Sequence, residues 1–193
     1  MPIARATWFC IDIEANGAVP GLYDMVSLGA TAVIRDETGE LKLGENFYME
    51  LKPVAPRFDP RAAAIHGLDQ DRLQREGLSR TAAAAALSQW VEQCTQPGTE
   101  PVFVGHNAPF DWSHVAYLYA EADQPNPFGY KALDTKALSA GVLNLHWLDT
   151  GKDVLFEKLG LPAEDKTQKH RADYDARVQA ELLRALLNHQ SGS

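Results

Sequence analysis

The chain has 193 residues, of which 45% are hydrophobic, and its formal net charge is −8. This length allows one domain with a full core, so we expect a single domain over 1–193, with its core at about 7–188 and a short tail at 189–193. The acidic balance argues against a protein that coats nucleic acid, because coating needs many Lys and Arg contacts to phosphates. A small acidic site that holds divalent cations can still bind one phosphodiester, since the cations supply the positive charge.

The amino-terminal segment indicates in which cellular compartment the protein is expected. Its apolar run at 8–11 is interrupted at once by Asp12 and Glu14, so it is too short for a signal peptide or a membrane span. We therefore expect a cytoplasmic protein with no membrane partner. The two cysteines, Cys10 and Cys94, lie far apart in the sequence and indicate reduced, buried thiols rather than a disulfide framework.

Residues 7–14 are predicted to form a central strand. Alternation places Phe9, Ile11 and Ile13 on one face, and the other face carries Trp8, Cys10, Asp12 and Glu14. The two acids then lie on the same side of the strand, roughly 6.5–7 Å apart along it. Two carboxylates near the end of a buried strand are costly unless a cation joins them.

Two further strand-like runs follow, at 25–34 and 46–51, and with the first they predict an antiparallel meander. After a proline-rich loop at 53–60, a short helical turn at 61–68 is stopped by Gly67. Ser79 is predicted to cap a packing helix whose buried side is formed by Ala83, Leu87, Trp90, Val91 and Cys94.

The second half of the chain alternates short strands with helices. A buried strand at 101–104 leads into a helix that begins near Pro109 and carries Asp111 in its first turn. A strand end at 133–135 passes into a helix with Asp134 or Thr135 as its cap. Beyond the helix near Pro109, three more helices are expected, over 136–143, over 153–160 and from 170 onward. This order predicts an α/β domain whose mixed β-sheet carries α-helices on its faces.

The last predicted helix opens with the segment 170–177, which sets the imidazole of His170 near Asp175. The positions that follow Asp175 at the spacing of one helix face are Val178, Gln179, Leu182, Leu183 and Leu186. Asp175 is therefore expected to point inward.

Taken singly, the polar residues have ordinary structural interpretations. Asp111 suits a helix-dipole partner, Asp175 a first-turn cap, and His106 a hydrogen bond to the backbone at a turn, which is the interpretation we favour for it. Asp12 and Glu14 could lie on a solvated strand face. Together, however, three or four carboxylates within roughly 5 Å repel by about 3 kcal/mol per pair at an effective dielectric of about 20, so a counter-ion is expected. Oxygen ligands suit Mg²⁺ or Mn²⁺ rather than zinc.

Four motifs in this order resemble those of the DEDDh group of 3′→5′ exonucleases. They are Asp12-Ile13-Glu14, then His106-Asn107, then Phe110-Asp111, and finally the spacing of His170, Ala172 and Asp175. The group includes the epsilon proofreading subunit of bacterial replicative polymerase, RNase T, oligoribonuclease and the TREX nucleases. The resemblance runs from Phe9 to about Leu187 and includes 65–68 and 134–135.

The resemblance implies a ribonuclease-H-like fold with two divalent cations, Mg²⁺ or Mn²⁺. Their ligands would be Asp12, Glu14, Asp111 and Asp175, in the arrangement that serves in-line displacement. His170 would take the proton of the attacking water, and an imidazole with an unperturbed pKa of about 6.5 suits that task near neutral pH.

The resemblance also implies contacts to the substrate, a single-stranded 3′ end. The backbone of Ala15, the side chains of Ile65 and His66, and Asn107 would border the terminal nucleotide. Many relatives follow the glutamate with Thr-Thr-Gly or Met-Thr-Gly, whereas this chain has Ala15-Asn16-Gly17, which leaves the preference between DNA and RNA open.

Two features beside the motifs concern partners. A basic cluster at Lys166, Lys169 and Arg171 is either a landing site for a phosphate backbone or a solvated loop. No extension that could tether a polymerase follows Ser193, so we expect a stand-alone enzyme. Several members of the group form homodimers, and a homodimer is therefore one option for this chain.

The hypothesis is therefore a metal-dependent 3′→5′ exonuclease that releases nucleoside 5′-monophosphates from single-stranded DNA or RNA. Two alternatives stay open at this point. One is a degenerate nuclease fold that serves as a binding module without catalysis, and the other is a metal-dependent phosphatase.

Overall fold

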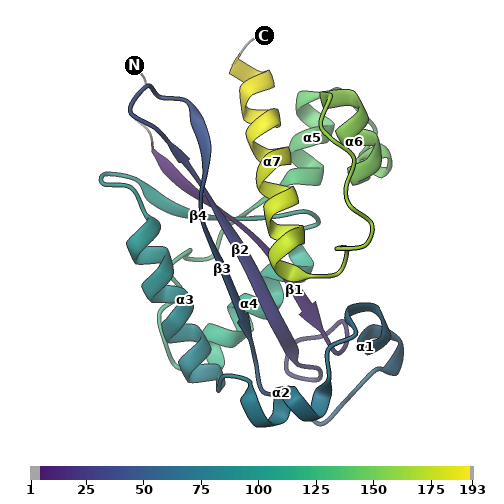
Figure 1. Cartoon of the computed structure of the whole chain (residues 1–193). Coiled ribbons are helices and arrows are strands. Elements are labelled where there is room, and N and C mark those ends of the chain that lie inside the picture. Colours follow the sequence, from purple (N-terminus) through teal and green to yellow (C-terminus); the bar gives the residue numbers. More distant parts are fainter. Residues whose placement is uncertain (1–4, 192–193) are drawn as a thin grey trace.

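The computed structural model describes residues 5–191 and contains a five-stranded mixed sheet (Figure 1). The strands are β1 (Ala6–Ala15), β2 (Met25–Arg35), β3 (Leu41–Glu50), β4 (Glu100–Gly105) and β5 (Ala132–Asp134), and their spatial order is β3-β2-β1-β4-β5. β1, β2 and β3 pair antiparallel, as the predicted meander requires, whereas β4 is parallel to β1 and β5 is parallel to β4. β1 is thus the central strand.

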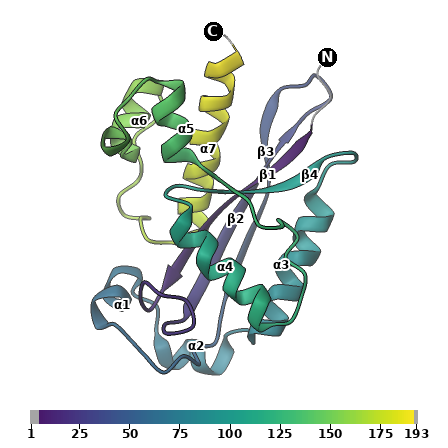
Figure 2. The same cartoon turned by 180° about the vertical axis from the view of Figure 1, so that it is seen from behind.

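Helices cover both faces of the sheet, which confirms the predicted α/β architecture (Figures 1 and 2). They are α1 (Pro60–His66), α2 (Gln70–Glu76), α3 (Arg80–Cys94), α4 (Pro109–Glu121), α5 (Thr135–Val142), α6 (Lys152–Leu159) and α7 (Ala172–Ser191), with a 3₁₀ turn at Trp147–Asp149. α7 packs on one face against β1, β2 and β3, flanked by α5 and α6, while α3 and α4 pack on the other face.

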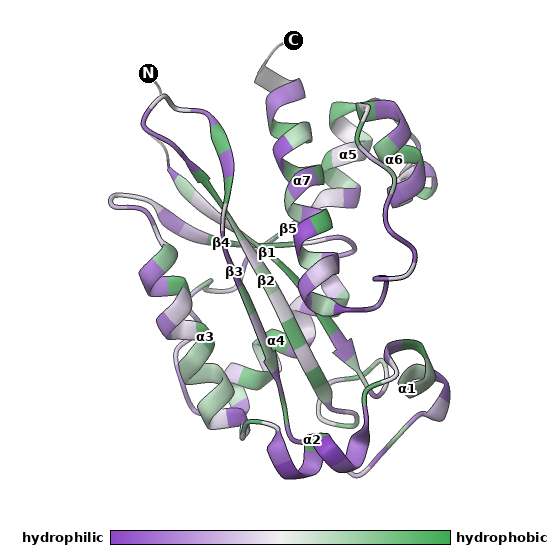
Figure 3. Cartoon of the chain, viewed as in Figure 1, coloured by the Kyte–Doolittle hydropathy of each residue, from purple (hydrophilic) through white to green (hydrophobic). Residues whose placement is uncertain are grey.

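The core differs between the two faces of the sheet. On the side of α3 and α4 it is aromatic, with the ring centroid of Phe9 at 5.3 Å from Trp90 and 5.7 Å from Phe128. On the side of α7, Cys10 packs with Leu183 and other apolar side chains of β2, β4 and α7. Figure 3 shows this apolar colouring along the strands and a hydrophilic loop between α6 and α7.

A glycine in β2 lets α7 begin directly on the sheet. Gly29 pairs with Asp12, and a Cβ at Gly29 would come within 2.1 Å of the carbonyl carbon of Ala172, the first residue of α7. Because no side chain stands there, the start of α7 lies beside the acidic end of β1. This close approach positions the functional side chains described below.

Several element boundaries differ from the prediction. The third strand begins at Leu41 rather than at 46, because Leu41 is buried and pairs with Arg35 across a short hairpin turn. α2 was not predicted, since Leu73 is its only buried residue and apolar periodicity is therefore absent. The last helix begins at Ala172 rather than at 170, because His170 has a φ of 65° and cannot continue a helix.

The remaining boundaries differ by a residue or so, within the fraying of helix ends. The helices predicted at 136–143 and 153–160 run over Thr135–Val142 and Lys152–Leu159. The residues set apart as a tail from 189 continue α7 as far as Ser191, and 192–193 lie outside the described residues.

Two expectations about composition can be compared with the structure. Both cysteines are free thiols, as predicted, and Cys10 is buried; Cys94 is partly exposed, so the expectation that both are buried was wrong for it. Over residues 5–191, the structure has no helix with the length and apolarity needed to cross a membrane.

Candidate active site

The carboxyl end of β1 opens into a pocket of about 290 Å³ between α4, α6 and α7. The residues that line it are Asp12, Ile13, Glu14, His106, Asn107, Phe110, Asp111, Lys152, Lys169, His170 and Asp175. All four acids selected from the sequence and His170 therefore meet in one place, although more than a hundred and sixty positions separate the first from the last.

The two acids of β1 lie on the face that turns toward α7, as strand alternation predicts. Asp12 is partly exposed, and its Oδ1 accepts a hydrogen bond of 2.8 Å from Nε2 of Gln179 on α7. Glu14, one pleat further along, has an exposed fraction of 9%. A carboxylate held by a side chain of the opposite layer has a fixed orientation, which a cation site requires.

Asp111 reaches the pocket from the first turn of α4, whose helix starts with Pro109. It is 5% exposed, and its Oδ1 accepts a hydrogen bond of 3.1 Å from the backbone N–H of Ile13. This bond joins α4 to β1 at the residue between the two acids of the strand. Asp111 therefore does more than complement the helix dipole.

Asp175 and His170 are linked by a backbone hydrogen bond. The N–H of His170 donates to Oδ2 of Asp175 over 2.8 Å, so Asp175 does bind the chain ahead of its own helix, as a cap would. Its other oxygen, Oδ1, is buried and has no hydrogen-bond partner among residues 5–191. Glu14, His170 and Asp175 each present a ligand atom within 4.8 Å of the other two.

Burial and mutual repulsion shift the pKa values of Asp12, Glu14 and Asp111 in the same direction. Burial, followed by repulsion from Asp12 and Asp175, raises the pKa of Glu14 to about 8. Burial is also the main cause that raises the pKa of Asp111 to about 7 and that raises the pKa of Asp12 well above its usual value. Cations would offset this repulsion, so the acids and the unpartnered Oδ1 of Asp175 fit a centre for hard divalent cations.

Two residues of this site were not selected from the sequence. Gln179 was placed on the inward face of the last helix, four residues after Asp175, and that spacing could have identified it as a partner of Asp12. Lys152, at the start of α6, places its Nζ 3.7 Å from Oδ1 of Asp175. No local pattern marks Lys152, because its neighbours in the pocket come from other elements.

His106 has a structural partner, as favoured from the sequence, but the partner of its Nδ1 is a side chain of α5 rather than the backbone of its own turn. Its Nδ1 lies 2.9 Å from Oγ1 of Thr135, and burial, aided by repulsion from Lys152, lowers its pKa to about 3. The neighbouring Asp134 caps α5, since its Oδ1 accepts hydrogen bonds from the N–H groups of Lys136 and Asn107. The cap left open between Asp134 and Thr135 is therefore Asp134.

The residues selected as substrate contacts are not all in the pocket. Asn107 lines it, with an exposed side chain and a φ of 69°. Ala15, Ile65 and His66 do not line it; they lie at the end of β1 and on the adjacent α1. Ile65 is 57% exposed, and Nε2 of His66 lies 3.2 Å from Oδ1 of Asn16, which ties α1 to the chain after β1.

The three residues of the basic cluster ahead of α7 have different surroundings. Lys169 lines the pocket, and Lys166 is exposed on the same loop. Arg171 instead bonds to Gln168 over 2.8 Å and to Asp173 over 3.0 Å on the surface. Only Lys169 of the three therefore faces the acids.

Comparison with known proteins adds independent findings. The family model described as RNase T, exonuclease, matches residues 9–183. The 3′-5′ DNA exonuclease Cap18 of Escherichia coli is 34% identical over 176 residues, which cover 91% of this chain and 89% of that protein. Ribonuclease T of Baumannia cicadellinicola is 30% identical over 189 residues, which cover 92% of this chain and 82% of that protein.

A solved structure shares the fold. The nuclease domain of 3′hExo, a DEDDh family member bound to rAMP, superposes with a TM-score of 0.74 at 12% identity, covering 95% of this chain and 91% of that one. At this identity the likeness concerns the fold alone, and the fold is the ribonuclease-H-like arrangement expected from the motifs.

Proposed function

The chain belongs to the RNase T exonuclease family and is a 3′→5′ exonuclease of DEDDh type; from this we propose that it removes nucleoside 5′-monophosphates from the 3′ end of single-stranded DNA or RNA. We further propose that the chain acts as one exonuclease domain. The observation that carries the proposal is the meeting of Asp12, Glu14, Asp111 and Asp175 with His170 in a single pocket.

Members of this family generally use divalent metal ions. We propose that the four acids hold two of them, Mg²⁺ or Mn²⁺. The unpartnered Oδ1 of Asp175 and the raised pKa of Glu14, to about 8, support a cation beside them. Cations held there by the four acids would supply Lewis-acid chemistry for an attacking water and for the leaving oxygen of a phosphodiester.

His170 is the proposed general base. Its side chain is exposed at the rim of the pocket, while its backbone N–H is held by Asp175, so the imidazole can reach the water without losing its position. The water oxygen forms a bond to phosphorus as its proton passes to the imidazole. The bond from phosphorus to the 3′ oxygen of the preceding nucleotide breaks, and that oxygen takes a proton from solvent water to leave as a hydroxyl, while the imidazolium of His170 returns its proton to solvent.

The terminal nucleotide would lie between the acids and α1. Phe110, which is 36% exposed and lines the pocket, offers an apolar ring to a base or sugar. Asn107 lies beside it, and we propose that Ala15, Ile65 and His66 border the nucleotide from the other side. One relative is named a DNA exonuclease and the other a ribonuclease, so both polymers are proposed substrates.

The test follows products from single-stranded DNA and RNA labelled at the 5′ end, with Mg²⁺ or Mn²⁺ present. We expect a ladder that shortens from the 3′ end, with nucleoside 5′-monophosphates as the released product. Asp12→Ala should abolish it, and His170→Ala should reduce the rate by about 10²–10⁴-fold, the usual contribution of a general base. Asp173→Ala is a matched control, because Asp173 lies near Asp175 on α7 but bonds to Arg171 outside the pocket.

Other outcomes point to other functions. Internal cuts, or equal activity in the Asp12 and His170 variants, would contradict the proposal. Cation binding without cleavage of any substrate would indicate a binding module. Release of inorganic phosphate from mononucleotides, with dinucleotides left intact, would indicate a phosphatase.

A further inference from the structure

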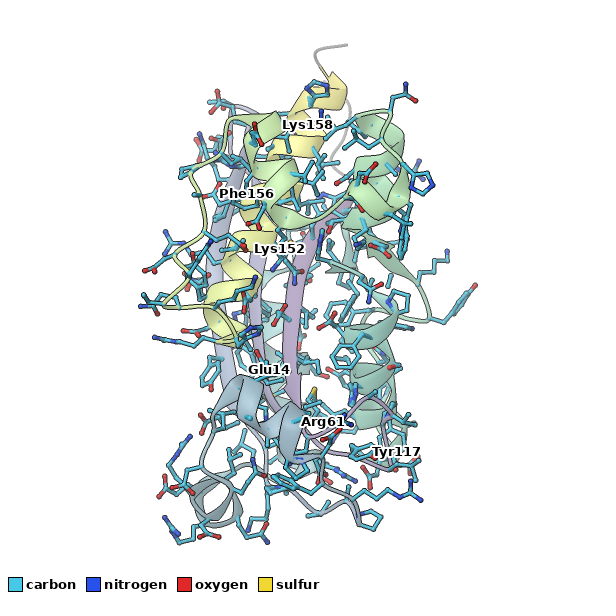
Figure 4. All side chains as sticks on the ribbon, turned by 90° about the vertical axis from the view of Figure 1, so that its right-hand side faces the viewer. Glu14, Arg61, Tyr117, Lys152, Phe156 and Lys158 are labelled. Atoms are coloured by element: carbon cyan, nitrogen blue, oxygen red, sulfur yellow. The ribbon has the colours of Figure 1, made fainter. Side chains whose placement is uncertain are left out.

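A lysine points into the acidic pocket from a helix that the proposed reaction does not use. Lys152 is the first residue of α6, and its side chain is only 17% exposed although it carries an ammonium group. Figure 4 faces this side of the molecule, with Lys152 above Glu14. An ammonium that is mostly withdrawn from water needs partners of opposite charge.

Two carboxylates provide those partners. The Nζ of Lys152 lies 3.7 Å from Oδ1 of Asp175 and 3.8 Å from Oε1 of Glu164. Both oxygens are buried, and neither has a hydrogen-bond partner among the described residues. At these distances the ammonium lies between the two acids without a close bond to either, so either acid can become its main partner.

Apart from the exposed Lys169, the charges of the site separate into two sets. Asp12, Glu14, Asp111 and Asp175 carry four negative charges when ionised, which two divalent cations would neutralise. Lys152 and Glu164 then form a second set that is neutral by itself. Glu164 does not line the pocket, and its side chain is only 6% exposed. Its buried carboxylate therefore has Lys152 as its cationic partner.

Lys152 therefore stands close to where a cation on Asp175 would lie. A positive charge there repels an incoming cation, and it stabilises the cluster of acids when no cation is bound. The effect reaches beyond Asp175, since attraction to Lys152 acts to lower the pKa of Asp12, Glu14 and Asp111.

We propose that Lys152 is a built-in counter-ion of the metal centre. In the metal-free protein it neutralises Asp175, and when a cation binds there its charge is taken up by Glu164. Lys152 is a positioning residue in this role, since it contacts no reacting atom, and it sets how tightly the centre holds its cations. The inference rests on the proposed function, because it requires that the acids bind cations.

The first test is isothermal titration of the full chain with Mn²⁺. Lys152→Met should raise the affinity on the order of tenfold, because it removes a positive charge near the bound cation, and Glu164→Gln should lower it by a similar factor. Lys158→Met is the matched control, since Lys158 lies in the last turn of the same helix, is exposed and does not line the pocket; it should leave the affinity unchanged.

A double variant distinguishes an exchange of ion-pair partners by Lys152 from two independent effects of charge on the Mn²⁺ affinity. If Glu164 acts through Lys152, Glu164→Gln should have little effect once Lys152→Met is present. If Glu164→Gln lowers the Mn²⁺ affinity equally with and without Lys152→Met, the proposed exchange of ion-pair partners is wrong.

Thermal unfolding supplies a readout that a merely structural lysine would not produce. With a chelator present, Lys152→Met should lower the Tm by about 3 °C, because the acids then lose their counter-ion. With saturating Mn²⁺ the deficit should vanish. An equal deficit in both conditions, or unchanged Mn²⁺ affinity in the variant, would overturn the inference while leaving the proposed function intact.

Two further results complete the test. If Lys152→Met weakens binding of a single-stranded oligonucleotide but leaves Mn²⁺ affinity unchanged, Lys152 is a phosphate ligand and the inference is wrong. If the unaltered protein binds no Mn²⁺ at all, the proposed function fails together with the inference.

Discussion

The two faces of β1 have the same local geometry and opposite roles. One face carries Phe9, Ile11 and Ile13, which are buried in the apolar core beneath α3 and α4. The other carries Cys10 under α7 and then, toward the carboxyl end, Asp12 and Glu14. A single strand thus contributes packing energy on one side and a charged pocket on the other, so stability and function can be altered separately.

The acidic face opposes folding when no cation is bound. Burial raises the pKa values of Asp12, Glu14 and Asp111, which means that each ionised carboxylate is disfavoured in the folded protein. The apolar face has no such group. Variants on the two faces should therefore change stability in opposite directions, and the predictions below begin with the largest effect.

Asp12→Asn should have the largest effect. Loss of a charged cation ligand removes several kcal/mol of transition-state stabilisation, so exonuclease activity should fall by about 10³-fold or more. The metal-free variant should nevertheless melt about 3 °C higher, because an asparagine oxygen can still accept the bond from Gln179 without the buried charge. Activity assays and calorimetry with a chelator check both. A variant that is inactive but melts lower would show that Asp12 is needed for folding.

Ile11→Ala tests the opposite face, one position earlier in the strand. Ile11 is fully buried, so the truncation should cost about 2–5 kcal/mol in the free energy of unfolding, measured by urea denaturation. At a temperature where the variant is folded, its activity per molecule should match that of the unaltered protein. A large loss of activity in the folded variant would mean that the two faces are not independent.

Gln179→Leu tests a residue of α7 that contacts the acidic face of β1. Gln179 is 1% exposed and orients Asp12, and its own Oε1 is buried without a hydrogen-bond partner in the described part of the chain. Loss of a residue that orients a ligand should weaken Mn²⁺ binding by about 10–100-fold, measured by titration calorimetry. Glu181→Gln, at a surface residue of α7 paired with Arg184, should leave the affinity unchanged. Equal losses in both variants would exclude a specific role for Gln179.

The last prediction concerns the pH dependence of the metal-free protein. Folding raises the pKa of Glu14 from 4.5 to about 8 and that of Asp111 from 3.8 to about 7. The folded state therefore binds more protons than the unfolded state between these values. The stability that this contributes is fully present below about pH 4 and is lost as the pH rises through about 7 and 8.

Thermal melts with a chelator at several pH values measure that slope. Mn²⁺ should reverse it, because the cation displaces protons and binds more tightly as the pH rises. A metal-free protein whose Tm rises steadily from pH 5 to pH 8 would contradict the raised pKa values.

Much of the site could be predicted from periodicity. Strand alternation placed Asp12 and Glu14 on one face, and helix spacing placed Asp175 inward with Gln179 beside it. These predictions succeeded because one face of each element is buried, which makes the pattern visible. The same rule explains why α2 was missed, since Leu73 alone is buried there.

What sequence could not reveal depends on contacts between distant elements. Lys152 and Glu164 lie in a helix start and a loop with no apolar period, and only the packing of α6 on α7 brings them to Asp175. His170 was assigned to the helix, whereas its left-handed backbone places it just ahead, where its N–H reaches Asp175. Such a conformation of a non-glycine residue leaves no periodic pattern in the sequence.

The most direct test of the central claim is an anomalous difference map from crystals of the protein grown with Mn²⁺ and a nucleoside 5′-monophosphate. The account predicts two peaks in the pocket, bound by Asp12, Glu14, Asp111 and Asp175, with the imidazole of His170 beside them. Peaks elsewhere, or an Asp175 turned away from Asp12 and Glu14 so that they share no ion, would contradict it.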